Sequence, residues 1–357
     1  MMKKIICITE NLGSGGAERQ LTGLAVMLKE AGYEVKFITY IEKQFHLDYL
    51  LENGVEYELL SKAANKYTRV YYLYKAFKQF KADVVISFLP HVNISVCLTR
   101  FFLKYKLIVS ERSSTQQVSL KDKIKFLLYH KADYVVANSY SETNNISNLF
   151  PSLNPKLRTI TNFIDTDKFC PAASHTESYV LQIITVGRII PLKNILNYIR
   201  AIRQVVDKGY LIKAVWIGDN YDTKYYEECL ALIEELGLKD VFIFKPQTNN
   251  IVEEYQKADI FCLPSFYEGF PNVICEAMSC GLPIVCSDVC ENPKIVEQGK
   301  NGFLFDPKNV NSICSSILKL ITDIKHTKIR IYNRELSICK FDKMNFLKEY
   351  VKLVDHR

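Results

Sequence analysis

Short apolar runs alternate with segments of helical periodicity along the whole chain. The runs that predict strands in the first half cover 4–9, 34–40, 55–60, 83–89, 106–111 and 134–139. The segments whose apolar residues recur every three or four positions, and which therefore predict helices, include 17–31, 68–81 and 120–131. Strands that alternate with helices are typical of a parallel sheet covered by helices, so we expect an α/β fold.

The same alternation begins again near residue 179. The strands predicted for the second half cover 179–187, 213–219, 241–246, 260–265, 283–288 and 303–306. The helices predicted between them lie near 194–208, 222–236, 250–257, 271–280 and 309–323. A chain of 357 residues is long enough for two domains. The segment 171–178, PAASHTES, is small, polar and aperiodic, so we place a linker there, between domains covering 1–170 and 179–340.

The segment 260–288 predicts a buried strand, a glycine loop, a short helix and a second buried strand. Pro271 suits the first turn of that helix, because its missing N–H has no use there, and Gly281 suits the helix end. The backbone N–H groups near Asn272 and Val273 would then point out of the helix N-terminus, where an anion is favoured. We therefore expect an anion site at this loop.

Two glutamates eight positions apart flank this site, Glu268 in the loop and Glu276 in the helix. The arrangement suits a ligand with phosphate in the middle and hydroxyl groups at both ends, such as a nucleotide sugar. The block 263–288 resembles the E-x7-E signature of retaining glycosyltransferases with the GT-B fold, the glycogen-synthase-like and capsule-forming group called family 4. The resemblance implies two Rossmann-like domains facing each other across a cleft, with a last helix in 341–357 that crosses back to the first domain.

The same resemblance implies roles for the residues of this loop. Glu268 would lie beside the transferred sugar and steady positive charge at its ring, and Glu276 would accept hydrogen bonds from both ribose hydroxyls. The other donor contacts implied are Gly269, Phe270, Pro271, Asn272 and Val273. The implied reaction is transfer of a hexose-type sugar with retention, in which the leaving phosphate oxygen takes the proton of the acceptor.

The segment 13–19, GSGGAER, joins the first predicted strand to the first helix, and its glycines allow a ligand to approach the backbone. It fails as a dinucleotide-binding fingerprint, because Glu18 occupies the third glycine position and the second strand ends at Tyr40 without an acidic residue. The family has a similar loop against the donor diphosphate. The resemblance therefore implies that Gly15 and Gly16 contact the donor; otherwise they only form a tight turn.

The segment 187–194, GRIIPLKN, is similar to the G-R-x4-K motif of the family and implies that Arg188 and Lys193 approach the diphosphate. Fixed cations stabilise the charge that develops on a leaving nucleoside diphosphate. Asp165 and Asp167 form a D-x-D triplet that could hold a divalent metal, but they lie in a stretch like the entry to the family's interdomain connection. We expect no metal and no cofactor, because cations and helix termini already supply the counter-charge.

The acceptor side departs from the family pattern. Many relatives place a histidine at the end of a first-domain strand, where this chain has Glu111 and Arg112. His91, after the preceding strand, is another candidate, although a lone loop histidine is more often structural. The family's glycine pair after SDV is also absent, and Cys290 and Glu291 stand there instead.

Composition argues against a zinc protein, a secreted protein and a membrane-spanning protein. Apolar residues make up 48% of the chain, and its 6 His and 11 Cys show no zinc-site spacing. The odd, scattered cysteine count fits a reduced cytoplasmic protein. Since the sequence has neither a signal-peptide pattern nor about 18 uninterrupted apolar residues, we expect it to be soluble or peripheral at a membrane.

The net charge of +7 lies in the first half, and residues 66–131 hold 13 basic and 3 acidic residues. The aromatic residues interleaved with these charges are Tyr67, Tyr71, Tyr72, Tyr74, Phe77, Phe80, Phe101, Phe102, Tyr105, Phe126 and Tyr129. Basic helices with aromatics suit an anionic membrane surface, here the inner face of the cytoplasmic membrane. Plain solvated helix faces are the alternative, and we expect no nucleic-acid partner.

The expected partners are a nucleotide-sugar donor and a saccharide or polyprenyl-linked acceptor. UDP is the default nucleotide by family frequency, while the sequence does not identify the sugar or the linkage. A nucleotide-sugar epimerase of the same fold and a non-enzymatic nucleotide-sugar-binding protein are the alternatives. The basic aromatic segment argues against the epimerase, which needs no acceptor surface.

Overall fold

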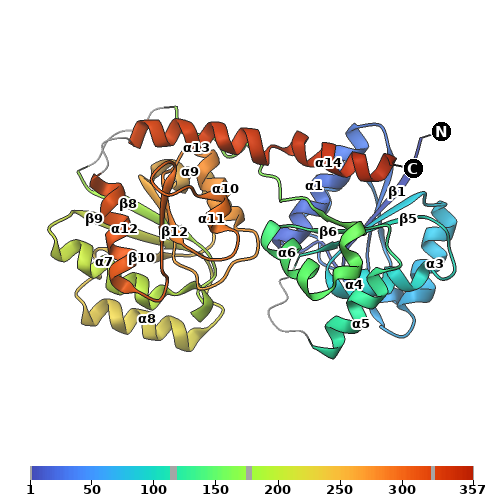
Figure 1. The fold of residues 1–357 in the computed structure, drawn as a ribbon, viewed down its shortest axis with the longest axis horizontal. Helices are drawn as coiled ribbons and strands as arrows, with labels where there is room; N and C mark the ends of the chain where they lie inside the picture. Colours follow the sequence, from blue (N-terminus) through green and yellow to red (C-terminus); the bar gives the residue numbers. More distant parts are fainter. Residues whose placement is uncertain (1, 113–118, 174–178, 323–325, 357) are drawn as a thin grey trace. The chain divides into compact units, whose positions relative to one another are not determined.

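The computed structural model describes residues 2–112, 119–173, 179–322 and 326–356. The chain divides into two compact units. The first unit contains Met1–Phe163 together with Met344–Arg357, and the second contains Ile164–Lys343. Each unit has its own parallel sheet, so both predicted α/β halves are confirmed (Figure 1).

The first unit is built on a seven-stranded parallel sheet with the order β3-β2-β1-β4-β5-β6-β7. Its strands are β1 (Lys4–Ile8), β2 (Glu34–Thr39), β3 (Glu56–Leu59), β4 (Val84–Phe88), β5 (Lys106–Glu111), β6 (Tyr134–Ala137) and β7 (Leu157–Thr159). Its helices are α1 (Gly16–Glu30), α2 (Leu47–Glu52), η1 (Ser61–Ala64), α3 (Arg69–Phe80), α4 (Pro90–Thr99), α5 (Leu120–Tyr129), α6 (Tyr140–Leu149) and η2 (Pro151–Lys156), joined by α14 (Lys343–Asp355).

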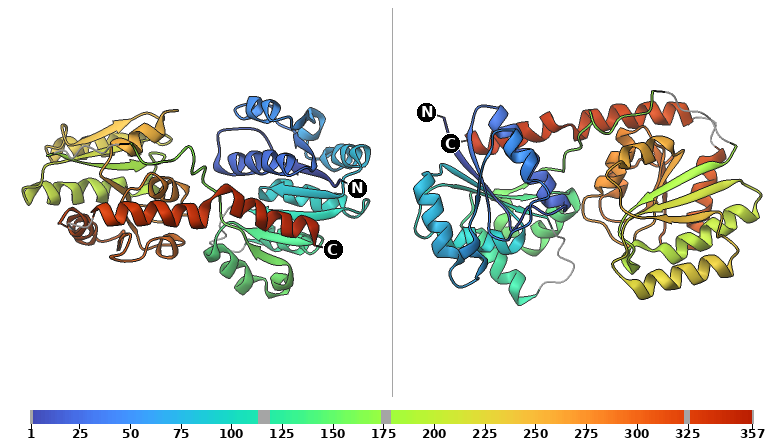
Figure 2. Two further views of the ribbon diagram at one scale, coloured as in Figure 1. Left: turned by 90° about the horizontal axis from the view of Figure 1, so that it is seen from above. Right: turned by 180° about the vertical axis from the view of Figure 1, so that it is seen from behind.

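The second unit is built on a six-stranded parallel sheet with the order β10-β9-β8-β11-β12-β13. Its strands are β8 (Leu181–Val186), β9 (Ile212–Ile217), β10 (Phe242–Lys245), β11 (Ile260–Leu263), β12 (Ile284–Ser287) and β13 (Gly302–Phe305). Its helices are η3 (Pro191–Lys193), α7 (Ile195–Asp207), α8 (Thr223–Glu235), α9 (Ile251–Lys257), α10 (Asn272–Ser279), α11 (Asn292–Ile295), α12 (Val310–Thr322) and α13 (His326–Phe341). Figure 2 shows the helices lying against the sheet of each unit.

In each sheet the chain adds strands first on one side of the first strand and then on its other side. In the first sheet β1 lies between β2 and β4, and in the second β8 lies between β9 and β11. In such open sheets the loops at the carboxyl ends of the two central strands diverge and leave a crevice for ligands. The topology therefore directs attention to the loops after β1 and β4 and to those after β8 and β11.

Every predicted strand is present, but several elements were not predicted from the pattern. Helix α4 is buried on most of its surface, including Val92, Val96 and Cys97, so its sequence has no polar face to reveal a helical period. Strand β7 has only 3 residues, which is too short for a recognisable alternation.

The compact units divide at Phe163/Ile164, whereas the first domain is predicted to end at 170. Ile164 and Phe169 are buried in the core of the second unit, and the Phe169 carbonyl accepts a hydrogen bond from Ser279 Oγ at 2.5 Å. This packing draws 164–170 into the second unit. Residues 174–178 of the predicted linker lie outside the described residues.

The chain returns to the first unit in α14. Its buried residues join the core around β1 and α1; they are Phe346, Leu347, Tyr350, Leu353 and Val354. Lys106 Nζ on β5 also donates to the Leu353 carbonyl at 3.1 Å. A last helix in 341–357 was expected to pack on the first domain. In the structure, α14 lies in this range and belongs to the first unit.

Candidate donor site and its surroundings

The loops after β8 and β11 are tied together at the switch point of the second sheet. The Phe266 N–H donates to the Leu192 carbonyl at 2.9 Å. Asn194, in the left-handed region with φ 60°, donates through Nδ2 to the Pro264 carbonyl at 2.9 Å and the Pro307 carbonyl at 2.7 Å. These bonds fix the two predicted motifs against each other.

Lys193 and Glu268 form an ion pair across these two loops. Lys193 Nζ lies 2.6 Å from Glu268 Oε1, and the side chains are only 13% and 12% exposed. A charge pair in such a shielded position interacts more strongly than it would in open solvent. The structure thus brings together one predicted phosphate ligand and the predicted sugar ligand, which lie 75 positions apart in the sequence.

Arg188 follows β8 and is exposed, with its guanidinium 5.7 Å from the centre of the Tyr221 ring. The backbone before it is shaped by close packing. A Cβ added to Gly218 would lie 2.1 Å from the Gly187 carbonyl oxygen, so only glycine fits there. Trp216 Nε1 donates to the same carbonyl at 2.8 Å. Arg188 therefore stands on a rigid strand end with its side chain open to solvent.

Helix α10 begins one residue later than Pro271 suggests, since Pro271 is its N-cap rather than its first residue. The Asn272 N–H donates to the Phe270 carbonyl at 3.0 Å, so this group of the predicted anion site is already engaged. At the other end, Gly281 has φ 81° and its N–H donates to the Met278 carbonyl at 2.9 Å. Gly281 therefore terminates the helix in the expected way.

Glu276 lies on α10 and is 5% exposed. One of its carboxylate oxygens accepts a hydrogen bond from the Tyr255 hydroxyl at 3.2 Å. Tyr255, on α9, is itself fully buried and was not predicted to support the site. A tyrosine in a core-like pattern gives no sequence signal for this contact, because its ring packs like any other apolar side chain.

In the first unit, the predicted glycine loop leads directly into α1. Gly15 is the N-cap, and its carbonyl accepts the Arg19 N–H at 3.0 Å. The Glu18 carboxylate folds back so closely that a Cβ on Gly15 would lie 2.2 Å from Oε2. Gly15 and Gly16 are both exposed. The two glycines are thus exposed at the helix N-terminus, where an anion is favoured, and in this structure the Glu18 carboxylate lies against Gly15.

His91 stands at the first turn of α4, beside the switch point of the first sheet. Its Nε2 lies 3.1 Å from Oε1 of Glu10, which follows β1. Leu89, just before α4, has φ 79°, a backbone conformation that is costly for a branched side chain. Backbone strain of this kind gathers at functional sites. Glu10 was not among the predicted residues, because a single acid after a strand has no distinctive spacing.

Glu111 is completely buried and makes structural contacts. Its Oε2 accepts from the Tyr129 hydroxyl at 3.0 Å and lies 3.1 Å from Lys125 Nζ. Burial, together with the Glu111 charge, raises the pKa of the Tyr129 hydroxyl well above its usual value. These bonds fasten β5 to α5.

Arg112 is held in a similar way by the first unit's own residues. Its guanidinium lies 3.8 Å from the centre of the Phe88 ring and is bonded to Asn162 Oδ1. Its Nη2 donates to the Tyr350 hydroxyl on α14 at 3.2 Å. Burial lowers the pKa of this guanidinium. Arg112 therefore joins the end of β5 to the returning helix.

The two aspartates of the D-x-D triplet serve local structure. Asp165 Oδ1 accepts the Lys168 N–H at 3.2 Å. Asp167 Oδ2 pairs with Lys343 Nζ at 2.7 Å, and this contact lowers the pKa of the Asp167 carboxyl. Both contacts lie within the second unit, close to where the chain leaves it.

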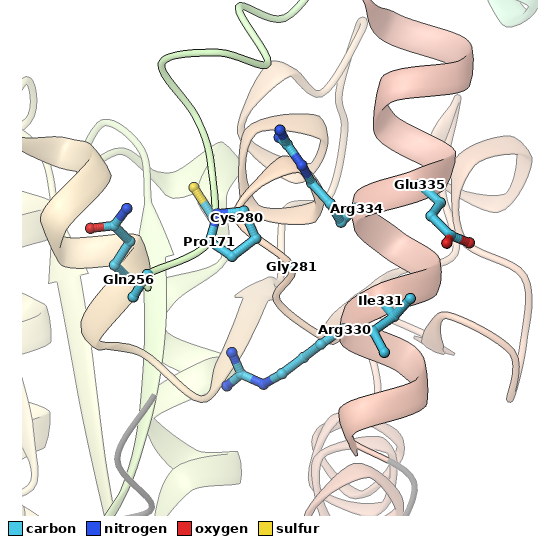
Figure 3. Close-up of a pocket in the computed structure, with 9 residues that line it drawn as sticks. Pro171, Gln256, Cys280, Gly281, Arg330, Ile331, Arg334 and Glu335 are labelled. Carbon is cyan, nitrogen blue, oxygen red and sulfur yellow. The ribbon is translucent and has the colours of Figure 1, made fainter. Parts of the chain in front are cut away.

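A cavity of about 330 Å³ lies elsewhere in the second unit, between α9, α13 and the end of α10 (Figure 3). In it Arg334 extends from α13, and its Nη1 donates to the Phe169 carbonyl at 2.8 Å and the Ser279 carbonyl at 3.1 Å. Its lining contains none of the predicted donor residues. The cavity is therefore separate from the candidate site, and Arg334 anchors the segment entering the second unit.

Comparison with known families covers most of the chain. The model "Glycosyl transferases group 1" matches residues 173–336, and the model "Glycosyltransferase Family 4" matches residues 14–168. The chain belongs to the family 4 group of glycosyltransferases, enzymes with the GT-B fold. The predicted family is thereby confirmed.

Two named relatives cover different shares of the chain. A Campylobacter jejuni GalNAc-alpha-(1->4)-GalNAc-alpha-(1->3)-diNAcBac-PP-undecaprenol alpha-1,4-N-acetyl-D-galactosaminyltransferase is 27% identical, over 99% of this chain and 98% of its own. An Escherichia coli UDP-Gal:alpha-D-GlcNAc-diphosphoundecaprenol alpha-1,3-galactosyltransferase is 28% identical, over 56% of this chain and 55% of its own. Among solved structures, Anabaena HepE in complex with UDP and glucose superimposes with a TM-score of 0.85 at 19% identity, covering all of both chains.

Proposed function

We propose that this glycosyltransferase moves a hexose-type sugar, with retention, from a UDP-sugar to a polyprenyl-diphosphate-linked saccharide. It works at the inner face of the cytoplasmic membrane in the assembly of a surface polysaccharide or glycan. The observation that carries the proposal is the shielded ion pair of Lys193 with Glu268 at the switch point of the second sheet.

On the donor side, each group has a task suited to its chemistry. Lys193 and the exposed Arg188 supply positive charge for the diphosphate, whose charge grows as the glycosidic bond breaks. Glu268, held by Lys193, faces the sugar and steadies positive charge at its ring. Glu276 accepts the ribose hydroxyls with the carboxylate that Tyr255 orients. In the second unit the backbone donors proposed for the ligand are Gly269, Phe270 and Val273, since the Asn272 N–H is bonded to the Phe270 carbonyl. In the first unit, Gly15 and Gly16 stay predicted donor contacts.

The nature of the acceptor is supported by the relatives. Those from Campylobacter jejuni and Escherichia coli are both named for acceptors on a diphospho-undecaprenol carrier. The Escherichia coli relative pairs UDP-Gal with an α-linked product. On the acceptor side of this chain, His91 with its partner Glu10 is the leading candidate, while Glu111 and Arg112 remain weaker ones because they are bonded within the unit.

A surface of the first unit suits a membrane that holds such an acceptor. Its exposed aromatic side chains include Tyr67 at 83%, Tyr71 at 53% and Phe102 at 69%. Lys75 Nζ lies 4.8 Å from the centre of the Tyr71 ring, which interleaves charge with aromatic surface. The exposed apolar residues of α5, at helical spacing, are Leu120, Ile124 and Leu127. In the described part of the chain, no helix is both long and apolar enough to cross a bilayer.

No metal is required in this proposal. Asp167 is already paired with Lys343, and Lys193 with Arg188 supplies the charge that a divalent ion would otherwise bring.

The test is sugar transfer from labelled UDP-hexoses with and without polyprenyl-diphosphate-linked saccharides. Release of UDP that depends on the lipid-linked acceptor, together with an α-linked product, supports the proposal. Free epimerised sugar nucleotide without acceptor would favour the epimerase alternative. Binding of UDP-sugar without turnover on any acceptor would favour a binding protein.

Membrane docking is tested by flotation on anionic and neutral vesicles. The triple variant Lys75/Lys78/Lys81→Glu should float less than the wild type on anionic vesicles at low salt, because each nearby basic group contributes about 1 kcal/mol. The control is the triple variant Lys224/Lys239/Lys257→Glu in the second unit, which changes the net charge by the same amount. Equal flotation of the wild type and the first variant would rule out this surface as the membrane-docking surface.

A further inference from the structure

The side chain of Arg188 is held by an aromatic ring. Its guanidinium lies 5.7 Å from the centre of the Tyr221 ring, within the range of a cation–π interaction. Within the part of the chain that the structure describes, Arg188 forms no ion pair and donates no side-chain hydrogen bond. The other predicted phosphate ligand, Lys193, is instead paired with Glu268 at 2.6 Å. The two cations of the candidate donor site are therefore restrained by different kinds of partner.

The loop that carries Tyr221 joins β9 to α8 and is fastened to the end of β8. Asn220 forms an isolated parallel bridge with Ile189, whose N–H donates to the Asp219 carbonyl at 3.0 Å. The Tyr221 N–H donates to the Ile189 carbonyl at 3.4 Å, and Asp219 Oδ1 accepts the Gln247 N–H at 3.1 Å. The main chain of Tyr221 is thus tied to the residue that follows the arginine.

Burial does not account for the position of the Tyr221 ring. The residue is 64% exposed, so core packing places little demand on its side chain. Among the residues that the structure describes, its hydroxyl has no hydrogen-bond partner. The ring, rather than the hydroxyl, is therefore the group that acts on Arg188.

An aromatic ring holds a guanidinium without using its hydrogen-bond donors. The attraction is between the face of the ring and the positive charge, so the N–H groups stay available for phosphate oxygens. A carboxylate partner would occupy those donors and offset the charge. A side chain that is already restrained also loses less conformational freedom when a ligand binds. The Tyr221 ring therefore suits a cation that must meet a diphosphate.

We propose that Tyr221 is a positioning residue, whose ring holds the Arg188 guanidinium ready for the donor diphosphate and leaves its charge and its N–H groups available. This inference rests on the proposed function, since that function assigns Arg188 to the diphosphate. The uracil ring is the other group of a UDP-sugar that an exposed tyrosine could contact, and the experiment separates the two roles.

The experiment measures UDP binding by calorimetric titration and initial rates with the sugar donor. In Tyr221→Leu the Kd for UDP should rise, and kcat/KM should fall, by about 2- to 5-fold, the factor expected for one exposed cation–π contact. Tyr221→Phe keeps the ring and should match the wild type. Tyr179→Leu, at a tyrosine of the same unit that is 99% exposed, is the control and should also match the wild type.

A double-mutant cycle assigns the loss to Arg188. Once Arg188→Ala has removed the cation, adding Tyr221→Leu should weaken UDP binding no further, because the contact is already absent. Uridine carries no phosphate, so it should bind the wild type and Tyr221→Leu equally when its binding is measured by ligand-observed NMR.

The positioning role would be overturned by unchanged UDP binding in Tyr221→Leu, or by a Tyr221→Phe variant that binds UDP as weakly as Tyr221→Leu. An equal loss in the Arg188→Ala background, or an equal loss of affinity for uridine, would overturn it as well. If the wild type bound UDP but transferred no sugar, the proposed function would fail instead. The binding cycle would still decide the role of Tyr221, so the two failures are distinguishable.

Discussion

Each unit places an ion pair at the carboxyl end of a buried strand, and the two pairs differ in what they join. In the second unit, Lys193 and Glu268 come from two loops at the same edge of the sheet. In the first unit, Glu111 ends β5, while Lys125 comes from a helix that covers the sheet. We therefore assign the pair that joins two loops of one sheet edge to the proposed donor site. The pair that joins a strand to a covering helix fastens the core.

The largest effect is expected from Lys125→Met, which breaks the ion pair of the first unit. This change removes the Lys125 charge that lies 3.1 Å from the buried Glu111 carboxylate, and breaking a buried pair costs about 3–5 kcal/mol. The free energy of unfolding of the first unit, measured in denaturant, should fall accordingly. Lys121→Met, at an exposed position on the same helix, should change it by less than about 0.5 kcal/mol. A stable Lys125→Met protein with much lower kcat/KM would instead place this pair in the acceptor site.

At Lys193 we expect a loss of activity with little change in stability, the reverse of the effect at Lys125. Loss of a charged contact to the diphosphate is worth about 1.5–3 kcal/mol, so Lys193→Ala and Arg188→Ala should each lower kcat/KM roughly 10- to 150-fold. Thermal stability should change little beside this loss of activity. Lys239→Ala, which removes an exposed ion pair with Glu234, is the matched control. Full activity in Lys193→Ala would remove the second-unit pair from the donor site.

A smaller effect should distinguish the two glutamates. Glu276→Ala should weaken UDP binding about 10-fold, while Glu268→Gln should mainly lower kcat, because only the latter residue faces the reacting sugar. Tyr255→Phe removes the hydroxyl that Glu276 accepts and should weaken UDP binding by about 2- to 10-fold. Calorimetric titration with UDP and initial-rate kinetics measure the two effects. If both glutamate variants merely raised KM, the division of roles would be wrong.

The smallest effect is expected from chelation. Since side chains supply the counter-charge, EDTA should change the rate by less than about 2-fold. The measurement is the initial rate in chelated buffer, followed by addition of Mn²⁺. Loss of turnover that Mn²⁺ restores would make Asp165 and Asp167 the leading metal ligands.

The strands and the family membership were predictable because their signals are local. Buried parallel strands are short apolar runs, and the segments around Glu268 and Lys193 keep family spacing. The contacts of these residues were not predictable in the same way. Tyr255 supports Glu276 from another helix, and Glu10 meets His91 from another strand, so no spacing within one segment reveals them.

The domain boundary stays a prediction. The two family models end at 168 and begin at 173, beside the predicted linker, while the compact units divide at Phe163/Ile164. Composition reports where the chain is polar. The division depends instead on which core receives Ile164 and Phe169, and both are apolar residues that either core could have accepted.

The return of the chain in α14 has a consequence for biosynthesis. A ribosome makes residues 1–163 first, but the core they form lacks Phe346, Tyr350 and Val354 until the whole second unit has been made. The second unit is continuous in sequence, so it can fold as soon as it emerges. The usual order of co-translational folding, with the N-terminal domain first, is thus reversed for the final packing step. During that interval the nascent first unit exposes the apolar surface that α14 later covers.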